Sequence, residues 1–223
     1  MAIPWWPARE RERARPAEPV SRDRVVEAAL ELLRAGGLDA LSMRKVAAEV
    51  GVSVSTVYWW AGNKEQLLAL VVDEIHGRIE LPADDPDVPW TEQLRVYAEN
   101  SYAVYAEHSF VLPIVFVGVL TGPHTCDLVE CGLRILRRGG LTHEQTVAAH
   151  AALAALILGF VRSGPRGDIV WTGGHRLEEL HPDRYPVTIA LAAELQTADP
   201  DGRFRFALDR FLAGLDRSRE RAG

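Results

Sequence analysis

Apolar residues recur every three or four positions in two segments near the start of the chain, which is the spacing of amphipathic helices. The first predicted helix begins at Ser21 and ends at the Gly36-Gly37 pair, because glycine favours a helix C-terminus. The second predicted helix is short and ends at Gly51. The apolar positions are Val26, Ala29, Leu30 and Leu33 in the first helix, and Met43, Val46, Ala47 and Val50 in the second.

Two more helices are predicted after Gly51. The third begins at Ser53, a favourable N-cap residue, and runs to Trp60. The fourth has Asn63 as its N-cap and Gln66 placed for a reciprocal capping contact. Its apolar positions are Leu68, Val71, Val72, Ile75 and Ile79. Two short helices that are joined by a tight glycine-containing turn and braced by longer helices form a helix-turn-helix.

The rest of the chain is also predicted to be helical. The expected helices cover Trp90 to His108, Phe110 to Leu120, Pro123 to Arg138, His143 to about Val161, and Arg203 to Arg217. Pro113 makes the second of these short and kinked, and Thr142 with Gln145 forms a capping box before the fourth. The chain is expected to be irregular from Gly164-Pro165 to about Arg184.

These patterns predict an all-α fold with two domains. Residues 1–20 alternate Arg with Glu, carry no apolar period, and are interpreted as a flexible arm. Residues 21–66 are expected to form an N-terminal three-helix helix-turn-helix domain. Residues 67–223 are expected to form a larger C-terminal helical domain.

The stretch VSVSTVYWWAGNK places three large aromatic residues, Tyr58, Trp59 and Trp60, one after another. They cannot share one buried helix face, because a helix turns by about 100° per residue. In a helix-turn-helix, the second short helix enters the major groove and presents its N-terminal residues to base edges. We therefore expect Val54 and Val57 to face inward. The side chains expected to project outward are Ser55, Thr56, Tyr58 and Trp59.

Basic residues flank this helix. Arg44 and Lys45 begin the preceding helix, where they can reach a phosphate or a guanine edge. Lys64 begins the fourth helix, beside backbone N–H groups that also favour a phosphate. In the alternative interpretation, the aromatic residues brace a small core and the basic residues form a solvated face. Taken together, the features favour binding of double-stranded DNA through Ser42, Arg44, Lys45, Ser53, Ser55, Thr56, Tyr58, Trp59, Trp60 and Lys64.

Charge is distributed unevenly along the chain. Residues 1–64 hold 10 Arg and Lys against 8 Asp and Glu, a net charge of +2, while the remainder holds 15 against 23, a net charge of −8. A mildly positive N-terminal part on an acidic body can face a polyanion with one end only.

Composition and apolar run lengths favour a cytoplasmic protein. The two cysteines, Cys126 and Cys131, suit neither a disulfide framework nor a zinc site, and we interpret them as reduced thiols. The first residues lack the apolar core of a signal peptide. The longest apolar runs fall short of the roughly 20 residues that a bilayer requires, so no membrane contact is expected.

The predicted helix-turn-helix resembles the DNA-binding domain of the TetR family of transcriptional repressors, in the stretch AALELLRAGGLDALSMRKVAAEVGVSVSTVYWWAGNKEQLLALV. Its TVYWW-x-x-NK is similar to the TLYWH-x-x-NK of the tetracycline repressor subgroup. A second stretch, TGPHTCDLVECGLRILRRGGLTHEQTVAAHAALAALILGFV, resembles that subgroup's ligand-binding core more loosely. The likeness spans most of residues 22–217 and implies a homodimer that binds operator DNA and responds to a small molecule.

The resemblance also implies which residues contact DNA. Operator bases or phosphates would be contacted by Arg44, Ser55, Thr56, Tyr58, Trp59, Trp60 and Lys64. Trp60 stands where the tetracycline repressor has a histidine, so we do not expect the operator preference of that repressor here.

The predicted helix at 143–161 has small Ala residues on nearly every side, and such an apolar helix must be covered all round. The last helix carries a broad Phe and Leu stripe that one chain does not obviously cover. A two-fold partner that presents the same two helices would cover both in one isologous contact. In the alternative, each chain covers these helices itself. A dimer would also place two recognition helices one DNA turn apart, on a palindrome.

A small hydrophobic effector is expected to bind between the helices around 94–120 and 143–160. The polar and aromatic residues that could line this site are Asn100, Tyr105, His108, Phe116, His124 and Glu144, each of which could instead be an ordinary core or surface residue. In the tetracycline repressor, a histidine shortly before the matching proline helps to bind magnesium, but here this segment is FVGVLTGP. Glu144 alone matches an acidic residue near that ion. We therefore expect no metal and no tetracycline–magnesium ligand.

An enzyme is the rival class of function. The seven histidines lie in no HExxH motif, cysteine-pair metal site or GxSxG elbow, and glycine-rich phosphate loops are lacking. A helical hydrolase with scattered site residues and a ligand-independent, architectural DNA-binding protein are the two alternatives. The expected function is a ligand-responsive repressor, without catalytic residues or cofactor. The fourth helix would transmit the signal, because a ligand that packs near Ile75, His76 or Ile79 would tilt it.

Overall fold

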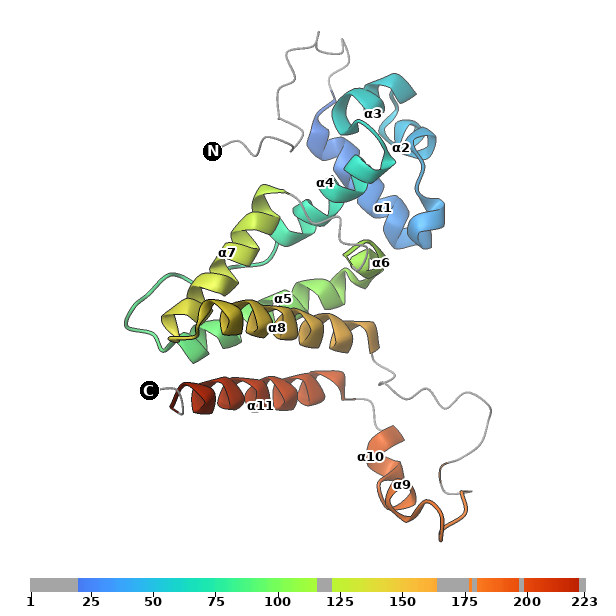
Figure 1. The fold of residues 1–223 in the computed structure, drawn as a ribbon. Helices are drawn as coiled ribbons and strands as arrows, with labels where there is room; N and C mark the ends of the chain where they lie inside the picture. The colour runs from blue at the N-terminus through green and yellow to red at the C-terminus, as the bar shows by residue number, and fades with distance from the viewer. Residues whose placement is uncertain (1–19, 116–121, 164–176, 178–179, 197–198, 221–223) are drawn as a thin grey trace.

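The computed structural model describes residues 20–115, 122–163, 177, 180–196 and 199–220. Within these residues the chain forms helices and loops without a strand, which confirms the predicted all-α fold. The predicted arm, apart from its last residue, lies outside the described part. In chain order (Figure 1) the helices are α1 (Arg22–Ala40), α2 (Met43–Val50), α3 (Val54–Ala61), α4 (Lys64–Gly77), α5 (Trp90–Glu107), the 3₁₀ turn η1 (Ser109–Val111), α6 (Leu112–Val115), α7 (Pro123–Arg138), α8 (His143–Ser163), α9 (Pro186–Ala190), α10 (Ala192–Gln196) and α11 (Pro200–Glu220).

Side-chain caps fix the starts of the first four helices. The Oγ atoms of Ser21, Ser42 and Ser53 each accept a hydrogen bond from the backbone N–H three residues on, and Asn63 does the same through Oδ1. Such a cap stabilises a helix by about 1 kcal/mol, because it satisfies an N–H group that has no partner within the helix. The predicted N-caps Ser53 and Asn63 are thereby confirmed.

The glycine pair in α1 interrupts the helix where the sequence predicted its end. Gly36 has φ −156° and Gly37 has φ 63°, and neither conformation is helical. One further turn, residues 38–40, follows this kink. At the end of α2, Gly51 has φ 77°, a left-handed conformation that glycine adopts at little cost. The two short helices α2 and α3 are therefore joined by a tight glycine turn, as predicted.

Helix α4 connects the two parts of the molecule. At its start it packs against α1 and α3, and further along it packs against α7 (Figure 1). Its buried side chains include Leu67, Leu70, Val71, Val72 and Ile75. Each such side chain contributes roughly 1.5–3 kcal/mol when it is fully buried, so α4 is held firmly along both contacts. The predicted domain boundary at residue 66 falls inside this helix.

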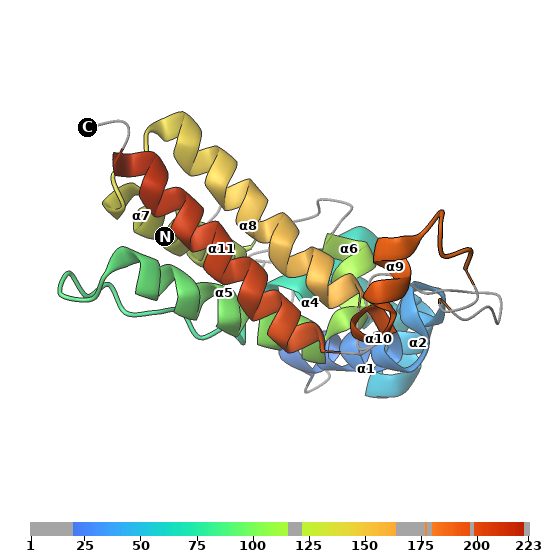
Figure 2. The ribbon, with the colours of Figure 1, turned by 90° about the horizontal axis from the view of Figure 1, so that it is seen from below.

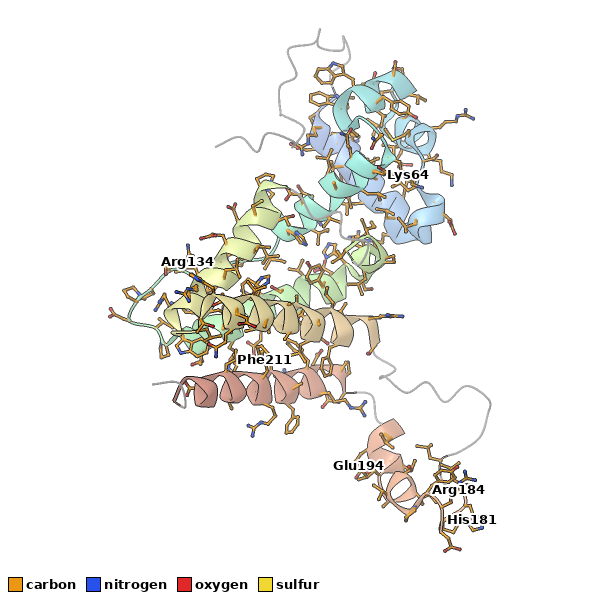
Figure 3. The ribbon with its side chains drawn as sticks, in the orientation of Figure 1. Lys64, Arg134, His181, Arg184, Glu194 and Phe211 are labelled. Atoms are coloured by element: carbon orange, nitrogen blue, oxygen red, sulfur yellow. The ribbon has the colours of Figure 1, made fainter. Side chains whose placement is uncertain are left out.

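Helices α5, α7, α8 and α11 form the larger C-terminal domain. Helix α5 packs against α7, α8 and α11, and α8 packs against α7 and α11. Figure 2 shows α8 and α11 side by side on one face of this domain, and in Figure 3 Phe211 lies between them. The core of the domain includes Leu94, Ile135, Leu136, Leu153, Phe204 and Leu208.

Some boundaries in the C-terminal half differ from the predicted ones. The helix predicted from Phe110 to Leu120 is represented by η1 and the short α6, and residues 116–120 lie outside the described part. Helices α9 and α10 were not predicted, and Figure 1 shows them projecting away from α8 and α11. Helix α11 begins at Pro200, three residues before the predicted start, because Asp199 caps the backbone N–H of Gly202 at 2.9 Å.

Helix α8 is long and apolar enough to span a bilayer by length and composition alone, and it is the one such helix in the described part of the chain. Over an 18-residue stretch of this helix the mean hydropathy is 1.6, and 28% of that stretch is buried within one chain. A helix that packs against a second protein chain meets the same criteria.

Candidate functional site

A cluster of hydroxyl groups forms the start of α3. Ser53 Oγ caps the helix by accepting from Thr56 N at 3.2 Å, and it lies 2.7 Å from Thr56 Oγ1 and 2.9 Å from Ser55 Oγ. The Ser53 hydroxyl is therefore occupied by contacts within its own turn. Ser55 is exposed, and the contact of its hydroxyl within this cluster is the one with Ser53.

The structure corrects the orientation of two residues of α3. Val54, which was predicted to face inward, is 37% exposed, and Thr56, which was predicted to project outward, is 5% exposed. The buried side of this helix consists of Thr56, Val57 and Ala61, which fall on one face at helical spacing. Val54, Ser55 and Tyr58 lie on the opposite, exposed side. The sequence pattern is ambiguous here because both ends of the short helix carry apolar residues.

The two tryptophans of α3 were interpreted either as DNA contacts or as a brace for a small core, and their positions fit both roles in part. Their rings meet edge to face, with centroids 4.3 Å apart, and both residues are half-buried. Trp60 packs against the core of the N-terminal domain. Each indole Nε1 is buried, with no hydrogen-bond acceptor among the described residues. The pair therefore braces the helix, while the partly exposed ring of Trp59 remains beside the outer face.

Basic side chains lie around α3 as predicted. Arg44 and Lys45 are exposed in the first turn of α2, whose N-cap is Ser42. Lys64 is exposed at the start of α4 (Figure 3), and its Nζ donates to the carbonyl oxygen of Leu38 at 3.3 Å. The structure thus brings the exposed α3 residues, the start of α2 and the start of α4 together in one small domain.

A buried chain of hydrogen bonds joins α4, α5 and α7 at the other end of α4. His76 Nε2 lies 2.6 Å from Tyr105 Oη, and His76 Nδ1 lies 2.8 Å from Thr125 Oγ1. Asp73 Oδ1 accepts from Thr125 N at 2.8 Å and from Thr125 Oγ1 at 3.0 Å. All four side chains are at most 7% exposed.

The hydrogen bonds and the burial of His76 together indicate its protonation state. The hydroxyl of Thr125 has one proton, which it donates to Asp73, so it can only accept from His76 Nδ1–H. In the neutral imidazole, His76 Nε2 then accepts from the Tyr105 hydroxyl. Burial, together with a smaller contribution from the nearby His124, lowers the pKa of His76 to about 4, so the imidazole is neutral at pH 7. Burial also raises the pKa of Tyr105, so its hydroxyl keeps the proton that it donates.

The buried histidine makes stability depend on pH. As the pH falls from the ordinary histidine pKa of 6.5 to about 4, the unfolded chain binds a proton at His76 before the folded chain does. The folded state is therefore fully favoured above that window and loses about 3 kcal/mol on crossing it. We expect urea unfolding at pH 7 and pH 4.5 to show this loss for the unmodified protein, and a correspondingly smaller loss for His76→Gln. Equal losses in the two proteins would contradict the assignment.

A second polar contact links α4 to the N-terminal domain. Arg78, just after α4, lies 3.3 Å from Glu27 of α1 and 3.6 Å from Glu74. Its other terminal nitrogen donates to His108 Nε2 at 3.1 Å, and His108 Nδ1 donates to the carbonyl oxygen of Val104 at 3.0 Å. The ion pairs are partly exposed and each contributes at most about 1 kcal/mol. They still tie α1, α4 and the end of α5 to one another.

Four of the predicted effector residues lie around the end of α4. Tyr105 and His108 are buried in the contacts just described. Asn100 Nδ2 donates to the carbonyl oxygen of Glu80 at 2.7 Å, and the ring of His124 lies against Gly77, about 3.0 Å from where a Cβ would stand. Glu144 is exposed in the first turn of α8 and is not brought to this cluster by any described contact. Phe116 lies outside the described residues.

The described residues also form a groove between α5 and α11, with a volume of about 500 Å³. Its lining is Glu99, Tyr102, Ala103, Ala106, Asp201, Phe204 and Arg205, and it includes none of the predicted effector residues. Tyr102 stacks on Phe204 at 4.1 Å and donates to Asp201 at 2.9 Å. Both contacts join α5 to α11 at the groove.

Asp73 and Thr125 were not among the predicted site residues. They are 52 positions apart, and neither belongs to a recognisable motif. The one available signal was His76, which follows Ile75 on the apolar side of α4 and was named as a point where a ligand could act. A histidine at such a position needs a polar partner when buried, but the sequence does not indicate which residue provides it.

Both parts of the chain match known protein families. Residues 25–71 match the family described as bacterial regulatory proteins, tetR family, and residues 81–219 match the tetracyclin repressor-like C-terminal domain. The chain belongs to the TetR family. It is a transcriptional regulator whose N-terminal domain is a helix-turn-helix and whose C-terminal domain is of the ligand-binding type, as the sequence predicted.

Relatives of this TetR-family protein are named as repressors. It is 32% identical to the HTH-type transcriptional repressor DrrR1 of Streptomyces coeruleorubidus, over 95% of this chain and 83% of that protein. It is 31% identical to the class D tetracycline repressor protein of Escherichia coli, over 64% of this chain and 65% of that protein. The structure of apo ActR from Streptomyces coelicolor superimposes with a TM-score of 0.81 at 29% identity, covering 92% of this chain and 99% of ActR. ActR has also been solved in complex with actinorhodin, and that structure has a TM-score of 0.78, covering 91% of this chain and 99% of ActR.

Proposed function

We propose that this TetR-family protein is a ligand-responsive repressor that binds a palindromic operator as a homodimer in the cytoplasm. A small, largely hydrophobic effector releases it from the operator. The observation that carries the proposal is the exposed face of α3, flanked by exposed basic residues at the starts of α2 and α4. In a helix-turn-helix this is the face that enters the major groove.

The DNA contacts divide into two kinds. Lys45 and Lys64 are compact charges suited to phosphates, which position the protein and give affinity that depends on salt. Arg44, Ser55 and Tyr58 are exposed and within the same domain, so they are suited to base edges and nearby phosphates. The tryptophans brace α3 against the core of its domain, and Ser53 caps the start of the helix. Ser42 acts through its cap on α2, and Thr56 through its buried contact with Ser53.

The exposed face of α8 supports the homodimer. This face contains Ala148, Ala151, Ala152, Ala155 and Gly159, all exposed in one chain. A Cβ placed on Gly159 would meet no atom within 4 Å, so a second helix can approach closely there. Helix α11 runs beside α8 (Figure 2) and carries Phe206, which is 67% exposed. A two-fold partner presenting the same two helices would cover both surfaces and form a four-helix contact.

The position of α4 supports a route from effector to DNA. The helix starts beside α3 with Lys64 and ends at the buried hydrogen-bond chain of His76. An effector that displaces α5 or α7 must either move α4 with them or break this chain. Movement of α4 would change the spacing of the two α3 helices, and the dimer would leave its operator. Release requires that the effector bind the DNA-incompetent state more tightly.

The first experiment is selection of duplexes from a random pool, followed by gel-shift titration. We expect enrichment of a palindrome, bound by two chains. Affinity should fall by roughly 10³-fold between 50 and 200 mM salt if the dimer makes about six phosphate contacts. Equal affinity for the selected and random duplexes, or affinity that does not change with salt, would contradict the proposal.

The effector is best sought by a thermal-shift screen of hydrophobic metabolites and antibiotics. ActR, which has the same fold, binds actinorhodin, and this supports including polycyclic aromatic compounds. A compound present at 100 times its Kd stabilises the folded protein by about 2.7 kcal/mol. We expect at least one such compound to weaken operator binding in the same gel-shift assay. Stabilising compounds that leave operator affinity unchanged would instead favour a ligand-independent, architectural DNA-binding protein.

A further inference from the structure

The recognition helix α3 lacks the side chains that usually read bases by paired hydrogen bonds. Its eight residues, VSTVYWWA, include no Asn, Gln, Arg, Lys, Asp or Glu. Two-point recognition of guanine requires Arg or Lys, and two-point recognition of adenine requires Asn or Gln. Helix α3 can therefore discriminate bases only through hydroxyl groups, aromatic edges and apolar contacts.

The serine and threonine hydroxyl groups at the start of α3 are largely engaged within the protein. Thr56 is 5% exposed and lies 2.7 Å from Ser53 Oγ, which also caps the helix. The Ser55 hydroxyl is exposed but shares a contact with Ser53 at 2.9 Å. A single serine hydroxyl can bond to any of several bases or to a phosphate, so it discriminates weakly.

The most exposed apolar side chain at the start of the helix is Val54. It is the first residue of α3 and is 37% exposed, and Tyr58, one turn later on the same face, is 48% exposed. The N-terminal residues of a recognition helix are the ones that reach base edges. Among the four bases of unmodified DNA, thymine alone presents a methyl group in the major groove. The exposed valine thus matches one base by its chemistry.

We propose that Val54 contacts the C5-methyl group of a thymine in each operator half-site. Helix α3 would then select its sequence chiefly through apolar contact, with Tyr58 beside it, while Arg44 of α2 supplies hydrogen-bonded recognition of a base. This inference rests on the proposed function, and it specifies the chemistry by which the protein selects DNA.

Uracil substitution tests the contact, because uracil keeps the pairing and the O4 acceptor of thymine and lacks the methyl group. Each thymine of the selected palindrome is replaced in turn, symmetrically in both half-sites, and affinity is measured by fluorescence anisotropy. We expect one position at which the substitution weakens binding of the unmodified protein by roughly fourfold per methyl group, or about 15-fold for the two half-sites.

The variant Val54→Ala should bind the original palindrome more weakly and lose its sensitivity at that one position. Because Val54 is exposed, the substitution should leave the fold intact, which a urea titration checks. Val129 of α7 is similarly exposed, at 36%, and Val129→Ala serves as the matched control that keeps full sensitivity to uracil.

Two results would overturn the role assigned to Val54 and leave the proposed function intact. One is a palindrome whose affinity is unchanged by every uracil substitution. The other is a Val54→Ala protein that keeps the full uracil effect at the sensitive position. A random pool that yields no preferred duplex would overturn the proposed function, and this assignment with it.

Discussion

Replacing Ala152 with glutamate is expected to separate the homodimer into monomers that no longer bind the operator tightly. Ala152 lies at the middle of the exposed small-residue face of α8, so the substitution leaves the packing within one chain undisturbed. In the proposed dimer it would place two carboxylates in an apolar contact. Burying an uncompensated charge costs about 3 kcal/mol or more, which corresponds to at least roughly a hundredfold loss of dimer affinity.

Sedimentation equilibrium measures this loss directly, and the gel-shift assay measures its consequence for DNA binding. The matched control is Ala106→Glu on α5, which introduces the same charge at an exposed alanine beside the α5–α11 groove. We expect that variant to remain dimeric. An Ala152→Glu protein that stays dimeric at micromolar concentration would contradict the α8 interface and leave its exposed face for another partner.

Replacing Thr125 with valine is expected to weaken the response to the effector more than it weakens operator binding. The hydroxyl of Thr125 accepts from His76 and donates to Asp73, so its loss removes the contact with His76 and one of the two bonds to Asp73, and only the backbone N–H of residue 125 still donates to Asp73. Leaving buried polar groups without partners destabilises the fold by about 1–3 kcal/mol. A typical coupling between two ligands is also about 1–3 kcal/mol, and we expect most of it to disappear.

The measurement is operator affinity with and without the effector found by thermal shift. Thr146→Val is the matched control, because Thr146 is also buried and its hydroxyl donates only to the carbonyl oxygen of Thr142, within the first turn of α8. It should lose stability but retain the full response. If Thr125→Val responds to the effector as strongly as the unmodified protein, the hydrogen-bond chain does not carry the signal.

Features set by neighbouring residues could be predicted from the sequence. The caps at Ser53 and Asn63 depend on one side chain and a backbone N–H three residues away. The capping box at Thr142 and Gln145 is confirmed for the same reason, with reciprocal contacts of 2.9 and 3.3 Å. The family resemblance is likewise confirmed, because the helix-turn-helix is a continuous stretch of sequence.

Features that depend on packing could not be predicted in the same way. The rotation of α3 that buries Thr56 and exposes Val54 depends on how the helix rests on α1 and α2, since apolar residues occur on more than one of its faces. The partners of His76 come from α5 and α7, 29 and 49 residues away. The short helices α9 and α10 carry no apolar period long enough to identify. The roles proposed for the DNA-contacting and effector residues remain predictions.

The spacing of the two half-sites tests the central claim most directly. Two α3 helices in a two-fold dimer should read half-sites one helical turn apart, on the same side of the duplex. Insertion of about five base pairs between the halves of the selected palindrome would turn them to opposite sides. We predict that anisotropy titration then gives the affinity of a single half-site. Unchanged affinity for the lengthened operator would contradict recognition by a rigid dimer, and with it the proposed mechanism of repression and release.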